Sequence, residues 1–149
     1  MSAPQSASQC IVVGFDGSKD SKAALRWAAR LSGAMGARLR IVHAVGLLEH
    51  AGLSDHAAAH RETALQLVTD AGVRSADVEW TVVDGDPCSG LLRMTIAPES
   101  ADLIVVGSRG SDAHAGSLLG STSLELAQHS AVPVLIVPAK NGIGDPAPG

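Results

Sequence analysis

Five short apolar runs separated by longer alanine-rich amphipathic stretches restrict this chain to few architectures. A short run without polar alternation is typical of a strand that is buried on both faces. Strands that alternate with helices form parallel sheets, because a crossover helix connects parallel neighbours. The sequence therefore predicts a single-domain α/β fold of the Rossmann-like kind, an open five-stranded parallel sheet with helices on both faces. The expected strands are residues 11–13, 39–45, 78–83, 103–106 and 134–137.

The stretches between the first three runs carry signals for two helices. Ser18 or Asp20 can cap a first helix, which the glycines in the region 33–36 end. A second helix is expected over about residues 55–70, with Gly72 as its stop.

Two further helices are expected in the second half of the chain. The pair Asp86 and Pro87 is a strong helix opening, because Asp can cap and Pro suits the first helical position. Pro98 ends that helix, and the last helix runs from Ser121 to about His129. The side chains expected to turn inward from these two helices are Leu91, Leu92 and Ile96, and then Leu124, Leu126 or Ala127.

Size and charge exclude several classes of function. The 149 residues fit one domain at residues 10–138, with flexible ends at 1–9 and 139–149. A formal charge of −4 without a Lys/Arg run argues against a nucleic-acid partner. No apolar stretch reaches membrane-spanning length and no secretory leader is evident, so we expect a cytoplasmic protein without a membrane partner.

The candidate metal-binding and catalytic side chains have simpler explanations. Cys10 and Cys88 are far apart in the sequence and are interpreted as ordinary reduced thiols. His56 and His60 lie four residues apart on the second helix without a glutamate between them, which favours a solvated helix face over a metal site. His43 falls within a buried strand pattern and is expected to be a core histidine. We therefore predict neither a metal site nor catalytic residues.

The glycine pattern after the fourth apolar run predicts a site for a phosphate. Gly107, Gly110 and Gly120 follow one another with two and then nine residues between them, and Ser121 opens the last helix. Glycines let backbone amides approach an anion, and the unpaired amides of a helix start face it. Arg109 is the cation of this loop. Neither the P-loop pattern nor the dinucleotide-binding glycine fingerprint occurs in the chain.

An acidic residue follows the first strand and predicts the other end of the same site. Ligands of open parallel sheets bind beyond the carboxyl ends of the strands, where the strand order reverses. Asp16 can accept hydrogen bonds from a ribose hydroxyl or an adenine amino group. The alternative is that Asp16 only shapes the turn before the first helix. If the first and fourth strands are neighbours, Asp16 and the glycine loop line one crevice, as a nucleotide requires.

These blocks resemble the universal stress protein family. The similarity extends over about residues 9–138 and is carried by residues 11–18, residues 101–110, the glycine spacing and residues 132–138. That spacing is similar to the ATP-binding branch of the family, whose fold is the adenine nucleotide alpha hydrolase-like one. A valine is common in the family at the position of Ala44, and some members have a proline at the position of Gly14.

The resemblance implies a role for each residue that matches the family's motifs. Gly14 and Asp16 are implied to contact the adenosine part, and the backbone of Ala44 the adenine. The positions that match the phosphate contacts, with neighbours that can contribute, are Gly107, Arg109, Gly110, Gly120, Ser121, Thr122 and Ser123.

The implied function is that of a dimeric module that senses ATP, with or without Mg²⁺ or Mn²⁺, in a stress response. The implied homodimer pairs through the fifth strand, Val134–Val137, a short strand between two prolines. Three alternatives remain open: a receptor for cyclic AMP or AMP, a nucleotide-filled scaffold that docks a client protein, and a slow ATPase. An ATPase is the least favoured, because the residues identify no general base.

Overall fold

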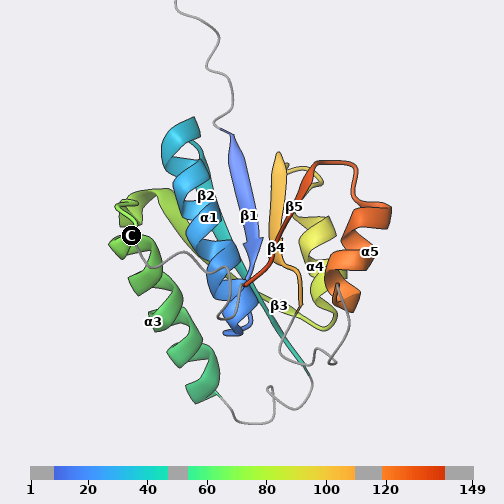
Figure 1. Ribbon diagram of the computed structural model, residues 1–149, viewed down its shortest axis with the longest axis horizontal. Helices are drawn as coiled ribbons and strands as arrows, with labels where there is room; N and C mark the ends of the chain where they lie inside the picture. The colour runs from blue at the N-terminus through green and yellow to red at the C-terminus, as the bar shows by residue number, and fades with distance from the viewer. Residues whose placement is uncertain (1–8, 47–53, 110–118, 140–149) are drawn as a thin grey trace, which may run out of the picture.

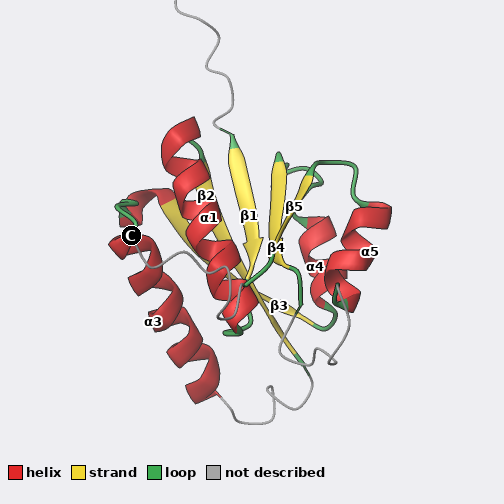
Figure 2. Cartoon of the chain, viewed as in Figure 1, coloured by secondary structure: helices red, strands yellow, loops and turns green. Residues whose placement is uncertain are grey.

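A five-stranded parallel sheet forms the centre of the protein (Figures 1 and 2). The computed structural model describes residues 9–46, 54–109 and 119–139. The strand order is β3-β2-β1-β4-β5, and all the pairs are parallel. The predicted fold class is confirmed, and the strands are β1 Cys10–Gly14, β2 Arg38–Val45, β3 Val78–Asp84, β4 Leu103–Gly107 and β5 Val134–Val137.

The strand order reverses between β1 and β4. From β1 the chain proceeds outward to β2 and β3, and it then returns to β4 on the other side of β1. Val12 faces Arg40 of β2 on one side and Ile104 of β4 on the other. The carboxyl ends of β1 and β4 are therefore neighbours, and loops that leave them in different directions open a crevice between them.

Helices cover both faces of the sheet and divide the core into two layers. Helices α1 and α3 lie against one face, and α4 and α5 against the other (Figure 1). Alternate residues of β1 pack into the two different layers. Ile11 packs with Leu25 of α1, and Val12 packs with Leu91 of α4. Since successive strand side chains point to opposite faces, a strand covered on both sides is apolar throughout. The helices are α1 Lys19–Met35, α3 Ser54–Asp70, α4 Pro87–Arg93 and α5 Ser121–His129, with a short 3-10 helix η1 at Ser75–Asp77.

Local capping chemistry sets both ends of α1 and the start of α4. The hydroxyl of Ser18 accepts a hydrogen bond from the amide of Ser21 and caps α1, whose last turn is closed by Gly36 at a φ of 65°. The carboxylate of Asp86 accepts from the amide of Ser89 at the start of α4. Within the described residues, no helix is both long and apolar enough to cross a lipid bilayer.

Two of the predicted inward-facing side chains are exposed. Helix α4 ends at Arg93, and the side chain of Ile96 lies beyond it with 63% of its surface exposed. In α5 the buried leucine is Leu126, whereas Leu124 is 48% exposed. A helix as short as α5 offers only a few turns for packing, so its periodicity does not decide which of its two leucines faces the sheet.

Candidate functional site

A cavity of about 490 Å³ opens at the carboxyl ends of β1, β2 and β4. That volume lies within the range of pockets that hold small molecules. Most of the residues predicted from the sequence lie on its wall: Gly14, Asp16, Ala44, Gly107, Gly120, Ser121, Thr122 and Ser123. Arg109 is not among the lining residues, and Gly110 lies outside the described residues.

Asp16 shapes a turn and lines the cavity at the same time. One oxygen of its carboxylate accepts the amide hydrogen of Ser18 at 2.9 Å, which is an Asx-turn. Its own amide donates to the hydroxyl of Ser21 at 3.3 Å. The turn therefore fixes the carboxylate at the cavity wall, and Ser18 rather than Asp16 caps α1.

Gly107 ends β4 where the first turn of α1 comes very close. A Cβ atom at this position would lie 2.6 Å from both the carbonyl carbon and the Cβ of Asp20. Real Cβ atoms do not approach so closely, so the packing of α1 on β4 requires a glycine here. This requirement is independent of any ligand, so Gly107 has a structural cause of its own, apart from the predicted binding of an anion.

The start of α5 forms the wall opposite Asp16. Gly120 is the N-cap residue and supplies no side-chain hydrogen bond to the helix. The first-turn amides of a helix have no intrahelical acceptor, so those of Ser121 and Thr122 are available to an anion at this wall. The buried hydroxyl of Ser123 instead donates to the carbonyl oxygen of Ser108, at 2.9 Å.

Four aromatic side chains form a cluster at the cavity, and three of them, Phe15, His43 and His60, line it. The Nδ1 atom of His43 lies 2.9 Å from the carbonyl oxygen of Phe15, as expected for a core histidine. Its ring stacks on Trp80, with the centroids 5.6 Å apart. The ring of His60 meets His43 edge to face at 5.0 Å and also lines the cavity.

The expectation that His60 lies on a solvated helix face is wrong. The ring packs against Phe15 and the backbone of Gly17, where a Cβ would lie 2.6 Å from its Nε2 atom. The helical periodicity of the sequence could have indicated that His60 faces inward. Ala64 and Val68, both buried, follow it at four-residue steps on the same face of α3.

The charged side chains on the cavity wall are acidic. Asp16 and Asp86 line it, whereas no lysine or arginine does so among the residues that the structure describes. An anion in this cavity would therefore depend on backbone amides and hydroxyl groups.

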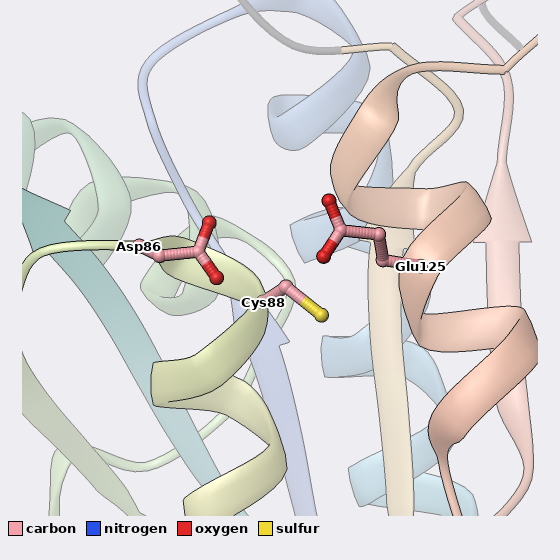
Figure 3. Close-up of side chains that lie close together, drawn as sticks. All are labelled: Asp86, Cys88 and Glu125. Carbon is pink, nitrogen blue, oxygen red and sulfur yellow. The ribbon is translucent and has the colours of Figure 1, made fainter.

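Asp86, Cys88 and Glu125 form a group beside the cavity, with their potential ligand atoms within 4.8 Å of one another (Figure 3). A thiol and two carboxylates are ligand types that Zn²⁺ accepts. However, one oxygen of Asp86 already accepts from both the amide and the hydroxyl of Ser89 at the start of α4. The helix start explains the position of this carboxylate without a metal ion.

Both thiols are expected to react slowly in the folded protein. Burial raises the pKa of Cys88, and the negative charges of Glu125 and Asp86 raise it further. Burial likewise raises the pKa of Cys10, more than the nearby Arg40 and Arg38 lower it. Only the thiolate is alkylated, so we expect iodoacetamide at pH 8 to modify the native protein roughly a hundred times more slowly than the urea-unfolded chain. Equal rates in the two states would contradict this burial.

Comparisons with known proteins place the chain in a family. Residues 8–138 match the sequence model of the Universal stress protein family. The chain belongs to this family, as the resemblance of its motifs predicted.

The similar proteins are of two lengths. The universal stress protein Rv1636 of Mycobacterium tuberculosis is 35% identical over 145 residues, which cover 89% of this chain and 97% of that protein. The universal stress protein Rv1996 of the same organism is 31% identical over 153 residues, or 86% of this chain and 47% of that protein. The chain thus spans about half the length of the first curated relatives it matches.

Among the solved structures that resemble this chain is one determined with a bound nucleotide. The crystal structure of a universal stress protein in complex with cAMP is 34% identical to this chain, with a TM-score of 0.72. The alignment covers 91% of this chain and all of that one.

Proposed function

We propose that this protein binds an adenine nucleotide in the cavity between β1 and β4 and acts as a nucleotide-sensing module in a stress response. The observation that carries this proposal is the position of the cavity at the reversal of strand order, with Asp16 on one wall and the start of α5 on the other. A carboxylate suits ribose or adenine donors, and the helix start suits a phosphate. The similar universal stress protein in complex with cAMP supports the ligand class.

The charges of the cavity favour a nucleotide that carries little negative charge. A cyclic phosphodiester carries one negative charge, whereas a triphosphate carries several. With two carboxylates and no described lysine or arginine on the wall, each further negative charge on a ligand is unfavourable unless a divalent cation accompanies it. Cyclic AMP is therefore our first candidate, and ATP with Mg²⁺ or Mn²⁺ the second.

Titration calorimetry on nucleotide-stripped protein tests the ligand. We expect cyclic AMP to bind roughly tenfold more tightly than ATP in a chelator, and added Mg²⁺ to strengthen ATP binding, because the cation neutralises the charges that the wall repels. Mass spectrometry of small molecules released from the freshly purified protein identifies the occupant. Absence of binding by cyclic AMP, AMP and ATP alike would overturn the proposal and favour a scaffold that docks a client protein.

We also propose that two copies pair through β5 in the cytoplasm. This strand is one edge of the described sheet, and its residues from Val134 to Ile136 are only half-buried in the single chain. An exposed apolar edge strand offers unpaired backbone groups to a second copy. Light scattering at micromolar concentration that gives the mass of one chain would contradict a homodimer.

A further inference from the structure

We propose that Asp20, a residue of the first turn of α1, positions the phosphate-binding wall of the cavity. It does so through Ser108, which links α1 to the start of α5. This inference rests on the proposed function, because its readout is the affinity for a phosphate-bearing nucleotide. Asp20 itself is not among the residues that line the cavity, so its role is that of a positioning residue.

The carboxylate of Asp20 is buried and accepts two hydrogen bonds from the neighbouring residues Ser108 and Arg109. It is 7% exposed. Its Oδ2 atom accepts from the hydroxyl of Ser108 at 2.7 Å and from the amide of Arg109 at 3.0 Å. A hydrogen bond to a carboxylate is stronger than one between neutral groups. Two such bonds fix the backbone directly after Gly107, at the point where β4 becomes the glycine loop.

Ser108 also makes hydrogen bonds to the start of α5. Its carbonyl oxygen accepts the amide hydrogen of Gly120 at 2.6 Å and the hydroxyl of Ser123 at 2.9 Å. The side chain of Ser108 is thus tied to α1 while its backbone is tied to the N-cap of α5. Through this one residue, Asp20 fixes where the first-turn amides of Ser121 and Thr122 face the cavity.

The chemistry of this link favours a carboxylate over an amide. A carboxylate only accepts hydrogen bonds, so it suits a hydroxyl and a backbone amide that both donate. The free-energy cost of burying this negative charge is offset by its position in the first turn of α1, because the amides of a helix start stabilise negative charge. An asparagine has the same shape, and its one oxygen could accept both donors, but it carries no negative charge, so each of the two hydrogen bonds is weaker.

The test compares a ligand that has a phosphate with one that lacks it. Calorimetry measures the affinities of the full chain for cyclic AMP and for adenosine in Asp20→Asn, Ser108→Ala and the exposed control Asp70→Asn. We expect Asp20→Asn and Ser108→Ala to weaken cyclic AMP binding roughly tenfold and adenosine binding less than about twofold, because only the phosphate wall loses its support. The control should match the wild type in both affinities.

Two further readouts keep the proposal testable if one variant folds poorly. The double variant Asp20→Asn/Ser108→Ala should lose no more cyclic AMP affinity than the stronger single variant, because both break the same link. Amide hydrogen exchange at Arg109 should be faster in Asp20→Asn than in Asp70→Asn, since its acceptor is weakened.

The outcomes separate this inference from the proposed function. If the wild type binds cyclic AMP but the Asp20 and Ser108 variants keep the wild-type ratio of the two affinities, the positioning role is wrong and the proposed function stands. A fall in thermal stability with an unchanged ratio has the same meaning, because it shows a merely structural contact. If the wild type binds none of the adenine nucleotides, the proposed function fails and this inference fails with it.

Discussion

Replacement of Gly107 by alanine is expected to lower the free energy of unfolding by about 2–3 kcal/mol, the cost of overpacking at a site that cannot relax. The added Cβ would lie 2.6 Å from the carbonyl carbon and the Cβ of Asp20, and 2.8 Å from its carbonyl oxygen. The clash involves backbone, so a side-chain rotation does not relieve it. Urea unfolding followed by circular dichroism measures the change.

Gly33→Ala is the matched control for this prediction. Gly33 lies within α1, and a Cβ there meets no atom within 4 Å. Alanine is the better helix former, so we expect this variant to gain about 0.5–1 kcal/mol. If Gly107→Ala were as stable as the wild type, the close packing of α1 on the end of β4 would be wrong, and the glycine would have to be explained by the ligand alone.

Replacement of Gly120 by alanine is expected to weaken nucleotide binding about a hundredfold, or roughly 2.7 kcal/mol. Gly120 lines the cavity at the start of α5, where the proposed phosphate site depends on close approach to backbone amides. Calorimetric titration with cyclic AMP measures the loss. The same wall is used in every ligand alternative considered, so ATP with Mg²⁺ should show a loss of similar size.

The fold should tolerate this second substitution. Gly120 has a φ of −77° and a ψ of 169°, an extended conformation that any residue adopts. Alanine is a poorer N-cap residue than glycine, so we expect a decrease of less than about 1 kcal/mol in the free energy of unfolding. Unchanged affinity in a folded Gly120→Ala variant would mean that the start of α5 does not bind the phosphate. A similar loss in Gly33→Ala would show that the effect is not specific to the cavity.

The sequence alone predicted the five strands and most of the residues that line the cavity at their carboxyl ends. Continuous apolar runs identified β1, β4 and β5, because a strand covered on both faces has no polar alternation. β2 and β3 also carry polar residues such as Arg40 and Glu79 and were recognised from the apolar residues around them. Ser18, the Asp86–Pro87 pair and Gly36 marked helix ends through hydrogen bonds made within a few residues. Such local chemistry acts over the span that a sequence pattern describes, so most predicted element boundaries lie within a few residues of the observed ones. The end of α4 is an exception, since the helix ends at Arg93 and not near Pro98.

The choice between equivalent helix faces could not be read from the sequence. Leu126 and Leu124 in α5 are both apolar, and only the position of the sheet decides that Leu126 is buried. His60 was assigned to a solvated surface because polar residues usually lie there. It packs instead against Phe15 and His43, since α3 lies beside the ends of β1 and β2.

The sequence by itself predicted the strands, several helix caps and most of the residues after β1 and β4 that line one cavity. Only the tertiary structure decided why Gly107 must lack a side chain and what Asp20 does. Asp20 and Ser108 are 88 positions apart, and a capping pattern accounts equally well for an aspartate in a first helical turn. Their hydrogen bond exists because the parallel pairing of β1 with β4 brings the start of α1 to the end of β4, a contact that no local pattern encodes.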